Sequence, residues 1–211
     1  SCHENTVSLA YDFFRILRFP QNNGAHHMYK YEWANAIART ERLGLSDGLR
    51  FIEMESRRIL NDKNMRKIPK ALTQIIKPEM GFRQLANECV SIHLMARDVI
   101  EKCISLPVFL TLGWVETTST EESNLYEFTE QDIQHKLIHG HHTPTMEIHA
   151  WLTLPSYEII DLTLSTTFAV NHNQLENAGK FIAKKADDVT GLIYRPMLVG
   201  DKYLEKIGVK I

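Results

Sequence analysis

A cysteine, a histidine and an aspartate follow one another along this 211-residue chain in an order that suits thiol chemistry. They are Cys89, His149 and Asp161. An imidazole beside a thiol can accept its proton, and a carboxylate behind the imidazole can orient the ring and stabilise its cationic form. The three residues are therefore candidates for a nucleophile, a general base and an orienting acid, provided that the fold brings them together.

Two alternating segments carry the histidine and the aspartate. Apolar residues occupy their even positions, namely Ala150, Leu152, Leu154, Ile160, Leu162 and Leu164. Successive side chains of a strand point to opposite faces of a sheet, so burial of one apolar face requires even-numbered residues to pair with even-numbered ones. With this register His149 and Asp161 share the other face, as direct or diagonal neighbours across the two strands.

The same register determines the connection between the two strands. Even-to-even pairing requires an odd number of loop residues, most simply Pro155, Ser156 and Tyr157, of which Pro and Ser suit a turn. A loop of two or four residues without a bulge would contradict this register. The alternative interpretation is an ordinary hairpin that carries two polar residues without a catalytic role.

The predicted nucleophile stands near the start of a helix. The apolar residues of segment 90–102 recur at helical spacing, namely Ile92, Met95, Ala96, Val99 and Ile100. Because the unpaired amides at a helix start carry partial positive charge, a thiolate is favoured at Cys89. Cys103 stands at the opposite end of the same helix and is interpreted as a buried packing residue. The nearly continuous apolar run at 106–115 is typical of a central strand buried on both faces.

The order of nucleophile helix, central strand, histidine strand and aspartate strand resembles the transglutaminase-like branch of the papain-like cysteine enzymes. The matching elements are Cys89, Leu112-Gly-Trp-Val115, His149-Ala-Trp151 and Asp161-Leu-Thr163. The resemblance covers roughly residues 81–165. This chain departs from the family pattern at Glu88, where a small residue often precedes the cysteine, and in the long His-rich segment before His149.

The resemblance implies an α+β fold with a papain-like or transglutaminase-like core, in which a nucleophile helix packs on an antiparallel sheet. It also implies a cysteine hydrolase or acyltransferase with Cys89, His149 and Asp161 as its catalytic triad. Its acyl-enzyme would pass to water in hydrolysis or deamidation, or to an amine in transamidation. The expected substrate is a peptide or protein, and no cofactor is expected.

Acyl transfer also needs a hydrogen-bond donor for the developing oxyanion. The backbone amide of Cys89 is the expected first donor. In papain-like enzymes a glutamine a few residues before the cysteine is a second donor, and Gln84 resembles that residue, so it joins the catalytic candidates. Asn87 is an alternative source of a side-chain amide. An exposed glutamine without a role is the alternative interpretation of Gln84.

The remaining histidines suggest a different chemistry. Four of them cluster before the histidine strand, namely His135, His139, His141 and His142. Two imidazoles four residues apart on a helix can bind zinc or another divalent metal. However, Lys136 stands where a metalloprotease motif would have a glutamate, and no cysteine or carboxylate cluster accompanies these residues. We therefore favour a polar segment near the site over a metal site.

One further histidine, His93, follows Cys89 by one helical turn. Two partners on one helix point the same way and leave no room for a substrate between them. His93 is therefore interpreted as a packing or surface residue rather than as the base for Cys89.

Composition excludes several other function classes. Lys and Arg total 24 against 26 Asp and Glu, a net charge of -2, which gives no support for nucleic-acid binding driven by charge. The three cysteines show no paired spacing, so a reducing compartment such as the cytoplasm is expected. No apolar run approaches the roughly 20 residues of a membrane span, and no membrane partner is expected.

We predict a helical region at residues 1–77 and a transglutaminase-like catalytic core at 78–211. Apolar stripes at helical spacing begin at Leu9, Trp33 and Leu49, and a fourth helix is predicted within residues 65–76. If catalysis were lost, this region could make the protein a binding module, which is the alternative function. The sequence leaves the oligomeric state open.

The predicted core contains three further features. Residues 117–129 are polar and acidic, which indicates a loop that could cover the site. A helix is predicted at 174–188 and a strand at 192–199. Because Pro196 cannot donate a ladder hydrogen bond, that last strand should lie at an edge or contain a bulge.

Overall fold

The computed structural model describes residues 15–16, 28–46, 54, 57–76, 80–118, 124–143 and 146–209, and its fold is α+β. Six strands form one sheet in the order β1-β5-β4-β3-β2-β6. They are β1 (Arg15–Ile16), β2 (Phe109–Thr117), β3 (His149–Thr153), β4 (Glu158–Asp161), β5 (Lys180–Lys185) and β6 (Leu192–Val199). The β1–β5 pair is parallel, and the other neighbouring pairs are antiparallel.

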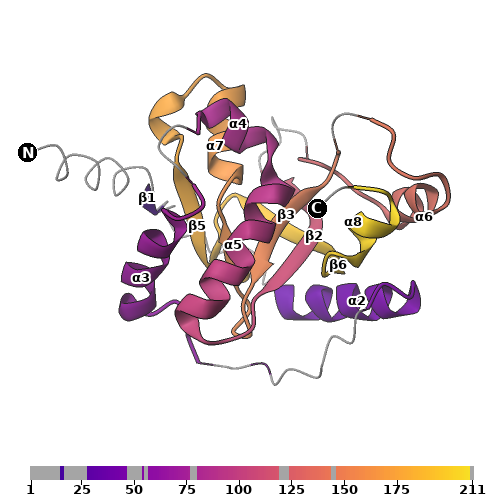
Figure 1. Ribbon diagram of the computed structural model, residues 1–211, viewed down its shortest axis with the longest axis horizontal. Coiled ribbons are helices and arrows are strands. Elements are labelled where there is room, and N and C mark those ends of the chain that lie inside the picture. The colour runs from indigo at the N-terminus through magenta and orange to yellow at the C-terminus, as the bar shows by residue number, and fades with distance from the viewer. Residues whose placement is uncertain are drawn as a thin grey trace, which may run out of the picture.

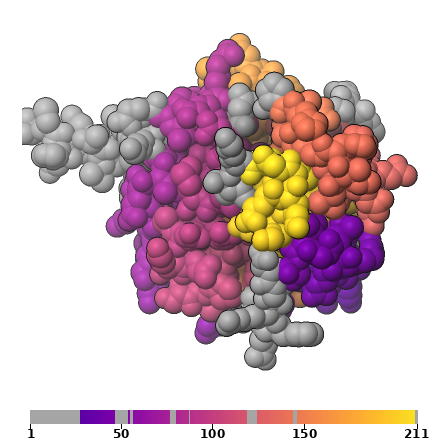
Figure 2. Space-filling view, turned by 45° about the vertical axis from the view of Figure 1, so that its right-hand side comes forward, coloured from indigo at the N-terminus to yellow at the C-terminus, as the bar shows by residue number. Residues whose placement is uncertain are grey.

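Helices cover both faces of the sheet. The described residues form α2 (Tyr29–Arg42), α3 (Asp62–Leu72), α4 (Phe82–Asn87), α5 (Cys89–Ile104), α6 (Glu130–His139), α7 (Leu164–Asn171) and α8 (Lys202–Lys206). In Figure 1, α5 lies in front of the strands with α3 beside it, whereas α2 lies apart from both, near β6. In Figure 2, α2 in indigo, α8 in yellow and α6 in orange gather on one side of the molecule.

The β3–β4 hairpin has the predicted register. Even residues pair with even and odd with odd, in the pairs Leu152–Ile160 and Thr153–Ile159. The backbone N–H of Leu154 donates to the carbonyl of Glu158 at 2.8 Å, so residues 155–157 form the three-residue connection. The odd loop length and the shared face of His149 and Asp161 are thus confirmed.

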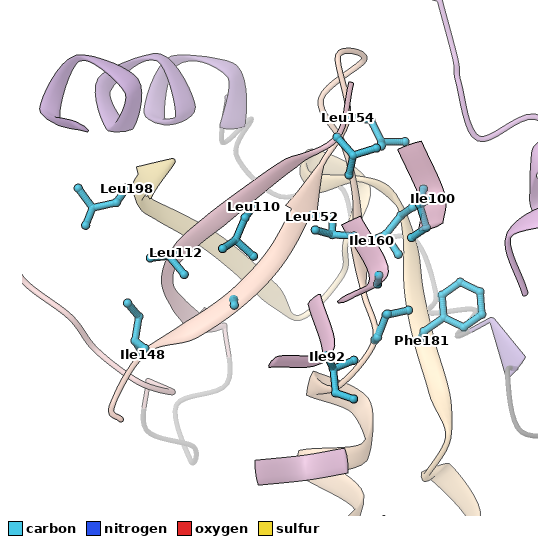
Figure 3. Close-up of a cluster of buried hydrophobic side chains, with 14 of the residues drawn as sticks. Ile92, Ile100, Leu110, Leu112, Ile148, Leu152, Leu154, Ile160, Phe181 and Leu198 are labelled. Carbon is cyan, nitrogen blue, oxygen red and sulfur yellow. The ribbon is translucent and has the colours of Figure 1, made fainter. Parts of the chain in front are cut away.

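An apolar layer fixes α5 on one face of the sheet. The layer consists of even-numbered strand residues and the inner side of α5, namely Leu110, Leu112, Ala150, Leu152, Ile160, Ile92, Ala96 and Ile100. Figure 3 shows Ile92 and Ile100 of α5 pointing toward Leu152 and Ile160. Full burial of one such aliphatic side chain contributes about 1.5–3 kcal/mol, so this layer is a major source of stability.

The predicted helix start is confirmed at Cys89. α4 ends at Asn87, and Glu88 has φ -113° and ψ 37°, outside the helical region, so the chain interrupts one helix and begins the next. α5 ends where Ser105 adopts a left-handed φ of 57°, with Cys103 half-buried in its last turn. The central strand is also confirmed, since β2 lies between β3 and β6 and residues 109–113 are buried.

β6 is the edge strand that its proline predicts. The pairing of β2 with β6 shifts register between Leu112 and Gly113, and Gly113 pairs with Pro196. A Cβ atom at Gly113 would lie 2.1 Å from the carbonyl oxygen of Arg195, a distance that no other residue could accept. Glycine therefore permits the close approach of the two strands at this irregularity.

The predicted helix at 174–188 is wrong. This segment contains a 3-10 turn η1 (Leu175–Asn177), strand β5 and a second 3-10 turn η2 (Ala186–Asp188). Residues 182–185 of β5 pair with β4, and the successive residues Phe181 and Ile182 are buried in opposite layers. Pairing with β4 outweighs local helix propensity, which is a weak preference.

The described residues of the region at 1–77 are helical only in part. The stripe beginning at Trp33 forms α2, and the fourth predicted helix is α3. The stripe from Leu9 is contradicted at residues 15–16, which form β1, and its other residues lie outside the described part of the chain. The stripe that begins at Leu49 continues in sequence through Ile59 and Leu60, and these two residues lie in a bend rather than in a helix. The division at residue 77 stays a prediction.

Candidate active site

His149 and Asp161 meet across the β3–β4 hairpin. His149 Nε2 lies 2.6 Å from Asp161 Oδ2, and both side chains are almost completely buried. Continuing the strand register places Asp161 opposite Trp151 and therefore diagonal to His149. This is one of the two arrangements that the alternation of apolar residues predicts.

The carboxylate of Asp161 is fully hydrogen-bonded. Oδ1 accepts from the backbone N–H groups of Thr163 at 3.1 Å and Leu164 at 3.0 Å. Oδ2 also accepts from the Tyr194 hydroxyl at 2.8 Å. Although burial raises the pKa of Asp161, the positive charge of His149 and these hydrogen bonds hold it well below its usual range. The carboxylate is therefore ionised at neutral pH.

His149 is a buried cation at neutral pH. Burial lowers the pKa of His149, but the charge of Asp161, its hydrogen bond and a further bond with the Cys89 side chain raise it to about 10. Since Nε2 faces Asp161, Nδ1 is left for the thiol of Cys89. Cys89 is half-buried at the start of α5, and its sulfur lies 3.6 Å from the Ile148 carbonyl oxygen. The structure thus brings the three predicted residues together.

Two aromatic rings stack on His149, and of the two the sequence indicated only Trp151, through the His149-Ala-Trp151 motif. The Tyr126 ring lies 5.7 Å from the His149 ring at an interplanar angle of 14°, and the Trp151 ring lies 5.9 Å away at 29°. Tyr126 adopts a positive φ of 59°, and its hydroxyl is hydrogen-bonded to Thr167 of α7. Burial raises the pKa of Tyr126, and the charges of Cys89 and Asp161 raise it further.

No local signal identifies Tyr126 from the sequence, because it follows a polar segment whose side chains show no periodicity. The only indication is the prediction that residues 117–129 form a loop close to the site. Tyr126 meets that expectation, since it lies against the base and near the nucleophile. Tyr194 is likewise found only through the pairing of β6 with β2.

His93, interpreted from the sequence as a packing or surface residue, is completely buried. Its ring centroid lies 6.3 Å from that of His149, and its Nε2 lies 3.8 Å from Asp161 Oδ1. Its position one helical turn after Cys89 is the sequence signal that could have placed it at the site.

The structure does not place Gln84 beside the thiol. Gln84 lies on α4 with an exposed side chain, and its amide donates to the carboxylate of Glu88 at 3.1 Å. Its role as an oxyanion donor stays a prediction. The side chain of Asn87, the alternative donor, lies outside the described part of the structure.

The His-rich segment forms no metal centre in the part of the chain that the structure describes. His135 and His139 lie on exposed positions of α6 with ring centroids 4.5 Å apart. His142 is hydrogen-bonded to the backbone carbonyl of His139. Among the described residues, no three His, Cys, Asp or Glu side chains gather in a way that could hold a metal ion.

None of the described helices is both long enough and apolar enough to cross a membrane. Comparison with known proteins found no matching family model, no matching curated protein and no matching solved structure. The geometry around Cys89, His149 and Asp161 is accordingly the ground on which a function can be proposed.

Proposed function

We propose that this protein is a cysteine-dependent acyl-transfer enzyme with a transglutaminase-like core. Cys89 is the nucleophile, His149 the general base and Asp161 the residue that orients the imidazole. The observation that carries the proposal is the 2.6 Å contact between His149 Nε2 and Asp161 Oδ2, with the other side of the imidazole turned to a cysteine at a helix start.

The arrangement of elements supports the transglutaminase-like core. The helix that begins with Cys89 packs on an antiparallel part of the sheet, and β3 and β4 present His149 and Asp161 from neighbouring strands. This agrees with the order of elements on which the resemblance to that family rests.

The buried ion pair supports a specific reaction sequence. In the resting site His149 already holds the thiol proton as an imidazolium, so Cys89 is a thiolate that attacks the carbonyl carbon of an amide or thioester. A carbon–sulfur bond forms, and the leaving amine or thiol departs with the proton that His149 returns to it. Water or an amine then attacks the acyl-enzyme and gives a proton to His149. The carbon–sulfur bond breaks, which releases the product and restores the thiolate and the imidazolium. The charge of Asp161 stabilises the imidazolium at each step.

Peptides or proteins are the proposed substrates, and the acceptor is either water or an amine. Their amide carbonyls are attacked by a thiolate in the same way in hydrolysis, deamidation and transamidation. The three reactions differ in the group that leaves or enters, so product analysis separates them.

The first test measures the reactivity of the Cys89 thiol. The second-order rate of alkylation by iodoacetamide at about pH 6.5 should exceed that of a free cysteine, because an adjacent imidazole activates a thiol as a nucleophile. Cys103 is the matched control, since it is also half-buried and lies at the opposite end of α5. Peptide mass spectrometry follows both thiols in one sample. A Cys89 that alkylates no faster than Cys103 contradicts the proposal.

The second test looks for the acyl-enzyme. A p-nitrophenyl ester should release one equivalent of nitrophenolate in a burst and leave an acyl group on Cys89. Cys89→Ala should abolish the burst, and His149→Gln should slow it by at least about 100-fold. Cys103→Ala should leave it unchanged. An acyl group found on another residue would contradict the assignment.

A further inference from the structure

His93 joins the two halves of the proposed site through both of its ring nitrogens. It is completely buried on α5, one turn after Cys89. Its Nδ1 lies 2.6 Å from the carbonyl oxygen of Cys89, and its Nε2 accepts a hydrogen bond from the Leu162 N–H at 2.9 Å. Because a carbonyl only accepts and an amide N–H only donates, Nδ1 carries the ring proton and the imidazole is neutral.

The two backbone groups that His93 binds belong to the chemistry. One is the carbonyl of the nucleophile, and the other belongs to Leu162, directly after Asp161. The apolar contacts of Ile92 with the sheet (Figure 3) are non-directional and do not determine how far α5 is displaced along its axis. A ring that is hydrogen-bonded through both nitrogens does determine the position of α5 along its axis. His93 therefore sets the spacing between the start of α5 and the end of β4.

The neutral state of His93 also protects the pairing of Asp161 with His149. Burial lowers the pKa of His93 to about 4, and the positive charge of His149 lowers it further. The charge of Asp161 and the hydrogen bond to Cys89 act in the opposite direction but do not outweigh burial. A charged His93, with Nε2 only 3.8 Å from Asp161 Oδ1, would compete with His149 for the carboxylate. At neutral pH His93 is uncharged, so Asp161 forms its ion pair with His149.

His93 is not itself a base for Cys89, because backbone groups occupy both ring nitrogens. We infer that His93 is a positioning residue, which holds the Cys89 thiol in register with the His149–Asp161 pair. This inference rests on the proposed function.

Thr40 on α2 provides a matched control. Like His93, it is buried, donates to the carbonyl four residues earlier on its own helix and accepts a strand N–H. The partners are the carbonyl of Ala36 at 2.7 Å and the N–H of Val199 at 3.0 Å. Thr40→Val removes both hydrogen bonds at nearly constant shape, away from the three proposed catalytic residues.

The test compares the alkylation rate of Cys89 in four variants. His93→Phe keeps a ring but removes both hydrogen bonds, and we expect a rate at least about tenfold below wild type, because small misplacements of reacting groups are costly. His93→Gln can return an acceptor to the Leu162 N–H and should restore the rate to within about threefold. His93→Asn is too short to reach Leu162 and should remain slow. Thr40→Val should leave the rate unchanged while lowering the melting temperature.

Each outcome has a distinct meaning. A wild-type Cys89 no faster than Cys103 would overturn the proposed function and this inference together. A fast wild type with equal rates in His93→Asn and His93→Gln would overturn the inference alone. Equal slowing by His93→Phe and Thr40→Val would also overturn it, because general destabilisation would then explain both. If His93→Phe does not fold, the Asn and Gln pair still decides the matter.

Discussion

The two faces of the central sheet are held by different interactions, although the same strands form both. Toward α5 the side chains of β2 and β3 are aliphatic. Toward α2 they form a hydrogen-bonded chain. Trp33 Nε1 donates to Thr111 at 3.2 Å, the hydroxyls of Thr111 and Thr153 lie 2.7 Å apart, and Tyr29 binds both Thr153 and Trp151 Nε1 at 2.8 Å. Alternation along the strands sends each kind of residue to its own side.

The difference indicates separate roles for the two faces. Apolar contacts stabilise in proportion to buried area but are non-directional, whereas a buried hydrogen-bonded chain tolerates one geometry and is costly when incomplete. The chain toward α2 ends at Trp151, which stacks on His149 and lies edge-on to Tyr194. Tyr194 in turn binds Asp161. The aliphatic face thus stabilises the fold through non-directional contacts, whereas the hydrogen-bonded face, which also buries Phe109 and Val115, aligns the residues behind the proposed base.

The largest effect should follow from truncation on the aliphatic face. Leu152 is completely buried between β2, β4 and α5, so Leu152→Ala should lower the free energy of unfolding by about 3–4 kcal/mol through lost burial and a residual cavity. Urea denaturation followed by circular dichroism measures the change. A loss below about 1 kcal/mol would remove the distinction between the faces.

A smaller effect should come from pH, through the buried charges on the polar face. The pKa of His149 is about 10 in the fold against an ordinary 6.5, so its contribution is complete below pH 6.5 and is lost as pH rises toward 10. We expect the free energy of unfolding to fall by about 2 kcal/mol between pH 7 and 9. His149→Gln should remove this part of the pH dependence. If denaturation curves of the variant and the wild type keep the same slope with pH, the assignment fails.

Below pH 6.5 the change in the free energy of unfolding with pH depends on two other groups, His93 and Asp161. His93 has a folded pKa of about 4, below its ordinary 6.5, so the unfolded chain binds a proton first and stability falls as pH drops from 6.5 to 4. The depressed pKa of Asp161 adds a loss below its ordinary 3.8. The free energy of unfolding should therefore be greatest close to pH 6.5, as far as these three groups determine it.

Breaking the hydrogen-bonded chain at its centre should cost less than truncating Leu152. Tyr29→Phe removes one hydroxyl and leaves the buried Trp151 N–H without its acceptor, for an expected loss of about 1–2 kcal/mol. Tyr31→Phe on the same helix is the control, since its side chain is 58% exposed and its loss should be negligible. Equal effects of the two substitutions in thermal unfolding would mean that the chain contributes nothing specific.

The smallest effect is expected at the far end of that chain. Thr111→Val keeps the shape of the side chain but leaves Trp33 Nε1 without its acceptor, at an expected cost of about 1 kcal/mol in unfolding free energy. The alkylation rate of Cys89 should stay at the wild-type value, because Thr111→Val leaves the Tyr29 hydroxyl in place as the acceptor of Trp151 Nε1. A slower rate would extend the aligning role of the polar face along its whole length.

Much of the candidate site was predictable because it depends on short-range periodicity. The alternation around His149 and Asp161 predicted both their shared face and the three-residue connection, and Pro196 predicted the edge position of β6. The helix predicted at 174–188 was wrong because the local composition of this segment favours a helix. β5 exists through its pairing with β4, which no local pattern reveals.

The sequence by itself determined that Cys89 starts a helix and that His149 and Asp161 share one face of a hairpin. Strand and helix periods, together with the burial of apolar residues, leave little freedom over such short distances. Only the tertiary structure decided that α5 brings Cys89 to that hairpin, that Tyr126 stacks on the base and that His93 connects Cys89 with Leu162. These contacts join segments far apart in the chain, and their geometry depends on how whole layers pack.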